Sequence, residues 1–557
     1  MNRRLFLGAV SSPLLAQVPG TPVNDDRASH LSNMDQASMA SMAAGAPGRS
    51  IPVPTRGYNN LRSGANTQET VLTPEALRQN PLRKLFGVSL PGDARGMEAQ
   101  PLFVPQVTAV DGQTHNLMLS ATMGNQIYCH DADDGTPLWM VLTGRPVAGS
   151  RDIDYWSINP HFGTMSTPVV DRGVLYALSA ISSDGTPARE AHWLVAIDIA
   201  KGTVLRRLQI TQQAALQRKQ RAALSLATVA GRRTIFIPFG TVQETAAGAH
   251  GFITAVDVDR FAIAAELNIT PTGFGGGIWQ AGAGMIADDQ GYLYAMTGNG
   301  TYDGASNFGE SFIRVQYDGT SLKIVDHYSP FRDSARPAAY SDQDLGSGGP
   351  SLIPELGLVF GAGKDAVLYT LPWRAMAKPA LPPIWWTFFP GNGVSPTDLN
   401  NLNKQWFGRT HHQHSTSPVW KSTAGWRTYC WGENAPLRAW SVDAGGCHYL
   451  ATGNEYASAQ SPVSANQAGG MPGAMMTLSA NGDRDGIVWA TVPDFDANKI
   501  ISTGRLLAYD ALNYINGNLQ LLWRSEEIVF NKFLSPVVNG GRVYVGTYDA
   551  QILTFGL

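Results

Sequence analysis

Two short motifs rich in glycine carry side chains that could bind a flat cofactor and a cation. The first is Gly275-Gly-Gly-Ile-Trp279-Gln, and the second, one strand pair later, is Met296-Thr-Gly298-Asn299-Gly300. An indole face stacks well on a planar aromatic molecule, and Ca²⁺ accepts side-chain carbonyl oxygens as ligands. The alternative for both motifs is structural, with Trp279 as a core residue and Asn299 as a turn residue.

A histidine cluster, Arg409-Thr-His411-His412-Gln-His414, offers a second kind of chemistry. If this segment is a strand, His412 and His414 point to the same side. Two neighbouring imidazoles could then bind a transition metal. The other interpretation is that both rings line a central face of the protein and form hydrogen bonds there.

The elements that must position these residues are short strands, because one strand-and-turn phrase recurs along the chain. It consists of an apolar run, then Ala-x-Asp or a close relative, then a polar turn and often an aromatic residue. Examples are Ile127–Trp139, Leu194–Asp198, Phe252–Asp257 and Leu506–Asp510. Repetition of strands and turns at a fixed period is typical of a propeller. The 59 Gly and 34 Pro residues suit the many tight hairpins of such a fold.

The repeats predict an all-β fold, an eight-bladed antiparallel β-propeller. We expect the eight units to begin near Glu98, Thr164, Ser225, Gly275, Gly346, Ser415, Met471 and Lys532. The last unit is short, so we expect it to borrow a strand from the segment around 85–89, which closes the ring and removes open sheet edges. Gln213–Leu224 is the one segment with the composition of a long helix.

The composition excludes several classes of function. A formal net charge of −3 with 15% charged residues gives no basic face for nucleic acid. Cys129, Cys430 and Cys447 form no Cys-x-x-Cys motif, which argues against a zinc ribbon and a c-type haem. Whether Cys430 and Cys447 pair is left open. No stretch after the N-terminus approaches the roughly 20 apolar residues of a membrane span.

The N-terminus has the pattern of an export signal. Arg3-Arg4 is followed by a short apolar run with small residues up to Ala16, and it also resembles the core of a twin-arginine signal. An ordinary Sec signal is the alternative. We therefore expect a signal at 1–16, a flexible arm at 17–84 with a short capped helix at 73–78, and the propeller at 85–557. The protein would be periplasmic or secreted.

These phrases resemble the quinoprotein alcohol dehydrogenase-like family over residues 85–557. The resemblance implies an eight-bladed propeller that holds pyrroloquinoline quinone (PQQ) and a metal ion on the ring axis. On this basis Trp279 would be the floor under the quinone, and Asn299 would be a metal ligand. Glu244, in the loop before the strand at Phe252, matches the family's metal-binding carboxylate, although the loop here has an Ala-rich filling.

The resemblance also implies the remaining site residues. Asp344 in Tyr340-Ser-Asp342-Gln-Asp344-Leu-Gly346 would be the general base and border the metal. Gly346 stands where lanthanide-using members have a second Asp, which favours Ca²⁺; if Asp342 were the base, that choice of metal would reverse. Lys364 and, more weakly, Glu98 would contact the quinone.

Two departures from the family's pattern bear on activity. The chain lacks the adjacent Cys pair that covers the quinone in many members, so Tyr155-Trp156 or Trp385-Trp386 would have to replace it. It also lacks a haem segment, so electrons would pass to an external acceptor. The expected function is a PQQ- and calcium-dependent dehydrogenase of an alcohol or sugar hydroxyl. The alternative is an exported propeller without a cofactor that serves as a binding or assembly scaffold.

Overall fold

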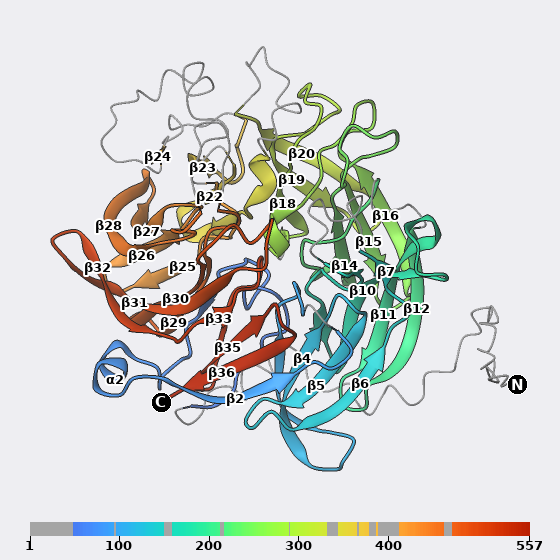
Figure 1. Ribbon diagram of the computed structural model, residues 1–557. Helices are drawn as coiled ribbons and strands as arrows, with labels where there is room; N and C mark the ends of the chain where they lie inside the picture. Colours follow the sequence, from blue (N-terminus) through green and yellow to red (C-terminus); the bar gives the residue numbers. More distant parts are fainter. Residues whose placement is uncertain are drawn as a thin grey trace, which may run out of the picture.

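Antiparallel sheets follow one another around a common centre in the computed structural model (Figure 1). The structure describes residues 48–93, 96–149, 159–211, 217–288, 290–330, 344–364, 367–377, 386–387, 412–461 and 470–557. The expected export signal lies outside these residues. In the described part of the chain, no helix has the length and apolar character needed to span a bilayer.

Five four-stranded sheets are each built from four consecutive strands, so neighbours in sequence are also neighbours in the sheet. Their strands are β3 (Leu102–Thr108), β4 (Thr114–Ala121), β5 (Gln126–Asp131) and β6 (Pro137–Leu142); β9 (Val169–Asp171), β10 (Val174–Ser182), β11 (Glu190–Asp198) and β12 (Thr203–Thr211); β13 (Ser225–Val229), β14 (Arg232–Phe239), β15 (Phe252–Asp257) and β16 (Ala262–Asn268); β17 (Ile286–Ala287), β18 (Tyr292–Met296), β19 (Phe312–Tyr317) and β20 (Leu322–Tyr328); and β21 (Ser351–Ile353), β22 (Leu358–Ala362), β23 (Val367–Pro372) and β24 (Trp386–Thr387). A two-strand ribbon, β7 (Val147–Ala148) with β8 (His161–Phe162), lies between the first two of these sheets in the sequence.

A sixth four-stranded sheet joins the two ends of the propeller. It contains β34 (Val537–Asn539), β35 (Arg542–Thr547), β36 (Gln551–Gly556) and, from the N-terminal side, β2 (Arg83–Ser89). Strand β2 pairs antiparallel with β36, from Arg83 opposite Gly556 to Ser89 opposite Gln551. The prediction that the last unit borrows an early strand is therefore confirmed, and the edge of β36 is paired.

The remaining strands form one ten-stranded sheet. Its strands are β25 (Val419–Ser422), β26 (Gly425–Cys430), β27 (Pro436–Asp443), β28 (Gly446–Tyr456), β29 (Met475–Asn481), β30 (Arg484–Pro493), β31 (Thr503–Ile515), β32 (Asn518–Arg524), β1 (Ala65–Asn66) and β33 (Ile528–Val529). The halves β25–β28 and β29–β32 meet at a single bridged pair, Thr452 with Asn518. Sheet pairing alone thus does not confirm the expected count of eight blades.

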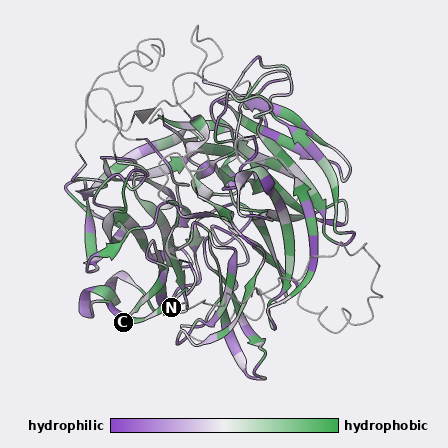
Figure 2. Cartoon of the chain, turned by 45° about the vertical axis from the view of Figure 1, so that its right-hand side comes forward, coloured by the Kyte–Doolittle hydropathy of each residue, from purple (hydrophilic) through white to green (hydrophobic). Residues whose placement is uncertain are grey.

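The hydrophobic core consists of clusters that lie between successive sheets. One cluster joins β9–β12 to β13–β15, and another joins β34–β36 to β3–β5. Further clusters fill the other interfaces between successive groups of strands, so the packing runs around the whole ring. Figure 2 shows hydrophobic residues running along the strands of the sheets. The outermost strands carry more exposed residues, as in Thr203–Thr211, because only one of their sides is covered by a neighbouring strand.

Residues 48–82 pack against the sheets, whereas the sequence predicted a flexible arm here. The Arg62 guanidinium is buried and donates hydrogen bonds to the carbonyl oxygens of Leu224 and Met285, which directly precede β13 and β17 of two different sheets. Helix α2 (Pro74–Gln79) has Thr73 as its N-cap, whose hydroxyl accepts from the Ala76 N–H, so the predicted short helix is confirmed.

The predicted helix at 213–224 is wrong over its described part, residues 217–224. Lys219 instead exchanges two backbone hydrogen bonds with Gly240, and Arg218 pairs with Glu266. The Gln, Lys and Arg residues favour a helix by intrinsic propensity, but pairing with the neighbouring loop overrides that weak preference.

Candidate functional site

Asp344, Asn299 and Lys364 come together from three loops of two neighbouring sheets. Asp344 precedes the 3-10 turn Leu345–Ser347, Asn299 follows β18, and Lys364 follows β22. The Asn299 N–H donates to Asp344 Oδ1 at 3.0 Å, and the Asp344 N–H donates to Asn299 Oδ1 at 3.2 Å. Lys364 Nζ lies 2.8 Å from Asp344 Oδ2. Both carboxylate oxygens of Asp344 therefore have a donor in place.

Glycine allows this close approach of the loops. A Cβ on Gly298 would lie 2.3 Å from Asp344 Oδ1 and 3.3 Å from Trp279 Cδ1. Gly298 thus leaves room for a carboxylate and an indole in the same place, which explains why the turn before Asn299 contains it.

Trp279 lies beside this group of polar residues. Its ring is half-buried, and a Cβ on Gly240 would come within 2.8 Å of it, so the backbone after β14 packs directly against the indole. The sequence motifs at Trp279, Asn299 and Asp344 therefore lie together in the structure.

Glu98 is fully buried and lies next to Arg221, a cation that no sequence motif marks. Arg221 Nε is 3.3 Å from Glu98 Oε2. The Arg221 guanidinium also lies 5.4 Å from the centroid of the Trp279 ring and 4.7 Å from that of Phe533. Within the described part of the chain, neither oxygen of Glu98 has a hydrogen-bond partner. Glu98 and Trp279 are thus linked through Arg221.

A further cation, Arg56, comes from the N-terminal segment. Its Nη2 donates to the Phe533 carbonyl oxygen at 2.7 Å. Burial lowers the pKa of Arg56 to about 10, and the nearby charge of Glu98 partly offsets this. The region around Trp279 therefore contains cations from three separate parts of the chain.

The histidine cluster borders the same region. The Gln413 N–H donates to the Gly363 carbonyl oxygen at 3.0 Å, and the Ser347 hydroxyl donates to the Gln413 carbonyl oxygen at 2.7 Å. These bonds hold the segment of His412 and His414 beside Lys364 and the turn after Asp344. His414 Nε2 lies 2.8 Å from Glu433 Oε1, so the expectation that these rings form hydrogen bonds is met for His414.

Glu244 is not part of the contacts just described. It lies half-buried in the loop between β14 and β15, four residues after Gly240, which packs against Trp279. Its role as a metal ligand stays a prediction. Asp342, Tyr155, Trp156 and Trp385 lie outside the described residues, so the alternative base and the expected cover of the quinone stay predictions as well.

The sequence alone does not point to Arg221, Glu433 or Phe533. No local motif marks them, since each is brought to the centre by contacts with distant loops. The three cysteines are all free and buried, so Cys430 and Cys447 do not form a disulfide. Cys430 lies 3.2 Å from the Ser417 hydroxyl, and Cys447 lies 3.6 Å from the Thr370 hydroxyl.

Comparison with known proteins gives one family match and several structural matches. The family model described as outer membrane protein assembly factor BamB matches residues 103–306. A search of curated proteins found no match to this sequence.

Three solved structures align with nearly the whole chain. A quinohemoprotein alcohol dehydrogenase from Comamonas testosteroni is 15% identical, with 95% of this chain and 83% of that chain covered and a TM-score of 0.59. The quinohemoprotein alcohol dehydrogenase ADHIIG from Pseudomonas putida HK5 is 14% identical, with 94% and 82% covered and a TM-score of 0.57. A europium-containing methanol dehydrogenase is 13% identical, with 94% and 100% covered and a TM-score of 0.56.

Proposed function

Because the chain has the β-propeller fold of the quinoprotein alcohol dehydrogenase-like proteins, we propose that it is a PQQ- and calcium-dependent dehydrogenase. It would oxidise an alcohol or sugar hydroxyl and pass the electrons to an external acceptor. The observation that carries this proposal is the meeting of Asp344, Asn299 and Lys364 beside the half-buried Trp279 ring. We further infer eight blades, with the ten-stranded sheet counted as two because its halves share one bridged pair.

The donor groups suit the two bound species. PQQ is flat and carries several carboxylates, and the region offers the Trp279 indole together with the cations of Arg221 and Lys364. For Ca²⁺, the Asn299 amide and the Asp344 carboxylate supply hard oxygen atoms. A carboxylate has about four lone-pair sites, and two donors, Lys364 Nζ and the Asn299 N–H, occupy Asp344. Oxygen lone pairs therefore remain for a cation or a substrate hydroxyl.

In the proposed reaction Asp344 is the base. It would accept the proton of the substrate hydroxyl, while the Lys364 ammonium and the Asn299 N–H keep the carboxylate in one orientation. When bound, PQQ would supply a hydride acceptor for the carbon that carries the hydroxyl, and calcium would supply a Lewis acid. Trp279, Lys364 and Glu98 would hold the quinone; Glu244, Asn299 and Asp344 would hold the ion. Gly346, two residues after Asp344, favours Ca²⁺ over a lanthanide.

The test is reconstitution of the purified full-length protein with PQQ and either Ca²⁺ or Eu³⁺. We expect one PQQ per chain with Ca²⁺, measured by its absorbance, and dye reduction with some member of an alcohol and sugar panel. Trp279→Ala should weaken PQQ binding, and Asp344→Asn should abolish dye reduction while PQQ stays bound. If Trp279→Ala binds PQQ as tightly as the wild type, the assignment of the stacking residue is wrong.

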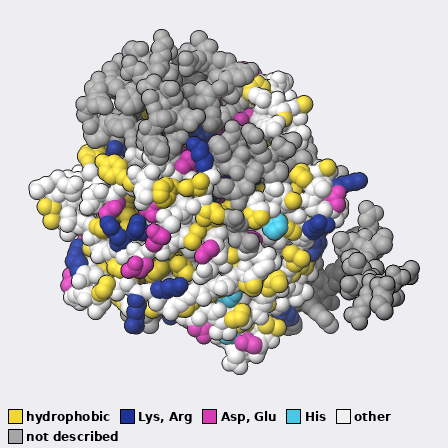
Figure 3. Space-filling view, in the orientation of Figure 1, with side chains coloured by type: hydrophobic (Ala, Val, Ile, Leu, Met, Phe, Trp, Pro, Cys, Tyr) yellow, Lys and Arg dark blue, Asp and Glu magenta, His cyan; other side chains and the backbone are white. Residues whose placement is uncertain are grey.

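A second candidate function is a cofactor-free scaffold for binding or assembly, outside the cytoplasm. The match of residues 103–306 to the BamB assembly-factor model favours it. The face in Figure 3 has acidic and basic side chains interspersed, with no block of one sign among the described residues, which fits neither a nucleic-acid partner nor an electrostatic membrane site. Failure of PQQ to bind under any condition would favour the scaffold. For either function we expect export through the N-terminal segment at 1–16.

A further inference from the structure

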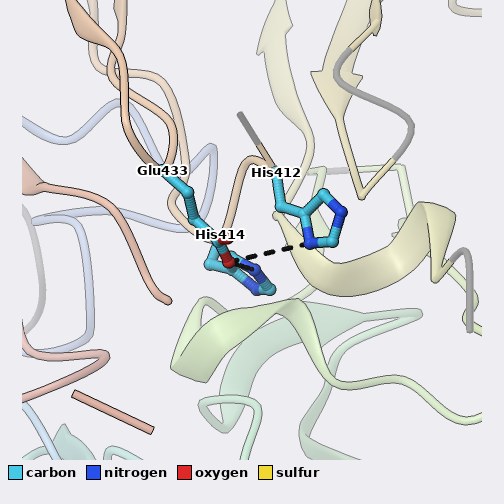
Figure 4. A group of neighbouring side chains, drawn as sticks. All are labelled: His412, His414 and Glu433. Atoms are coloured by element: carbon cyan, nitrogen blue, oxygen red, sulfur yellow. Dashed lines mark hydrogen bonds and ion pairs between the residues drawn. The ribbon is translucent and has the colours of Figure 1, made fainter. Parts of the chain in front are cut away.

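Two histidines and a glutamate form a compact group of potential metal ligands (Figure 4). His414 Nε2 lies 2.8 Å from Glu433 Oε1, and His412 Nδ1 lies 3.7 Å from the same oxygen. One ligand atom from each of the three residues lies within 4.8 Å of the others. Zinc–ligand bonds of about 2.0–2.1 Å place neighbouring ligands of a tetrahedral ion roughly 3.3–3.4 Å apart. Small side-chain movements would therefore bring all three atoms into coordination.

The backbone fixes where the three side chains sit. Glu433 follows strand β26, and its N–H donates to the His412 carbonyl oxygen at 3.0 Å. The alternation of a strand-like segment places His412 and His414 on one side, with Gln413 bonded away from them to Gly363 and Ser347. The arrangement thus comes from two adjacent segments that are already hydrogen-bonded to each other.

The burial of these three side chains favours a bound metal ion over a histidine–glutamate pair without one. Glu433 and His414 are both 2% exposed in their side chains, and His412 is 11% exposed. Among the described residues, His412 Nε2 is buried with no hydrogen-bond partner, so this ring is not held on its second nitrogen.

We propose that His412, His414 and Glu433 bind a divalent transition-metal ion of the Zn²⁺ class, separate from the calcium site of the proposed dehydrogenase. Imidazole nitrogens and a carboxylate oxygen suit Zn²⁺ and its neighbours, whereas Ca²⁺ prefers ligands that are all oxygen. Three protein ligands leave one position of a tetrahedral ion open to water or another molecule. The ion would lie close to the Asp344–Lys364 pair, because Gln413, between the two histidines, is hydrogen-bonded to Gly363 and Ser347.

The test is zinc binding by the full-length protein in the absence of PQQ and calcium. After treatment with a chelator, the protein is titrated with Zn²⁺ against a chromophoric competitor, and the bound metal is counted by atomic spectroscopy. We expect one Zn²⁺ per wild-type chain. Glu433→Gln and His414→Gln should each lower the affinity at least about 100-fold, since each removes a direct ligand. Co²⁺ should give visible absorption bands of a tetrahedral ion in the wild type only.

The matched control is His448→Gln. His448 also pairs with a carboxylate, Asp443 Oδ1 at 3.1 Å, but the two side chains are 47% and 66% exposed, so zinc affinity should not change. If His414→Gln does not fold, as judged by its thermal unfolding, the isosteric Glu433→Gln variant carries the test. The proposal is overturned if the wild type binds no zinc, if Glu433→Gln binds it equally well, or if Asp344→Asn is the variant that loses it. None of these results bears on PQQ binding, so the two proposals fail separately.

Discussion

Asp344 and Asn299 hold each other through two reciprocal hydrogen bonds, each from the backbone N–H of one residue to the side-chain oxygen of the other. The two residues are 45 positions apart and belong to loops of neighbouring sheets. This pairing fixes both side chains before any ligand binds. Preorganisation of this kind lowers the cost of binding a cation or a substrate, because little remains to be ordered.

The fit between these two loops should be sensitive to one added methyl group. We predict that Gly298→Ala lowers the free energy of unfolding by about 1–3 kcal/mol, because its Cβ would overlap Asp344 Oδ1 at 2.3 Å. The matched control is Gly87→Ala in β2, where the nearest atom would be at an ordinary 3.5 Å. Urea unfolding measures both. Equal stability of the two variants would contradict the close approach of the loops.

The Asp344–Lys364 ion pair should matter far more than an exposed one. Its side chains are only 11% and 13% exposed, so Lys364→Met leaves a buried carboxylate without its cation, at a cost of about 3–5 kcal/mol. Adding Asp344→Asn should restore part of that stability. The control is Lys421→Met, whose pair with Glu355 is 58% exposed on both sides, where we expect a change below about 1 kcal/mol. A denaturant-based double-mutant cycle separates the pair from other effects of each substitution.

Most of the strand order of the propeller could be predicted from the sequence, because five of the sheets are each built from consecutive strands. Apolar runs that end in Ala-x-Asp mark strands such as Leu194–Asp198, and consecutive strands pair. Even the closing strand was foreseen, since the last unit lacks one. The helix expected at 213–224 is wrong over residues 217–224, because backbone pairing of Lys219 with Gly240 overrides composition.

The candidate site was only partly predictable, for a physical reason. Trp279, Asn299 and Asp344 stand in recognisable glycine-rich turns, so a motif could find them. Arg221 and Glu433 stand in no motif, and their partners, Glu98 and His414, lie 123 and 19 positions away along the chain. Such contacts depend on how the sheets are arranged around the centre, which local patterns do not determine.

The N-terminal segment should be an essential part of the fold. Arg62 donates to three carbonyl oxygens, those of Arg56, Leu224 and Met285, in a buried environment. Arg62→Met removes all three of these buried, charge-assisted hydrogen bonds, so we expect a loss of more than about 3 kcal/mol of stability. The control is Arg260→Met, since the Arg260 side chain is 69% exposed. A thermal unfolding midpoint for Arg62→Met equal to that of the control would show that the segment is dispensable.

A buried histidine should make the protein sensitive to mild acid. Burial, with a smaller effect of the nearby Arg218 charge, lowers the pKa of His192 to about 3. The unfolded chain takes up a proton on this histidine near pH 6.5, whereas the folded chain does not. The stability that the neutral His192 contributes is therefore fully present above about pH 6.5, and it is lost progressively as the pH falls toward 3. The ring makes edge contacts with Phe162 and Phe239, with centroid distances of 6.0 and 5.3 Å, and its Nε2 lies 3.6 Å from Glu190 Oε1. We predict that His192→Phe removes about 2 kcal/mol of the destabilisation seen at pH 5 relative to pH 7, as measured by urea unfolding at both pH values. If His192 were protonated in the folded protein, His192→Phe would instead leave the pH dependence of the wild type unchanged.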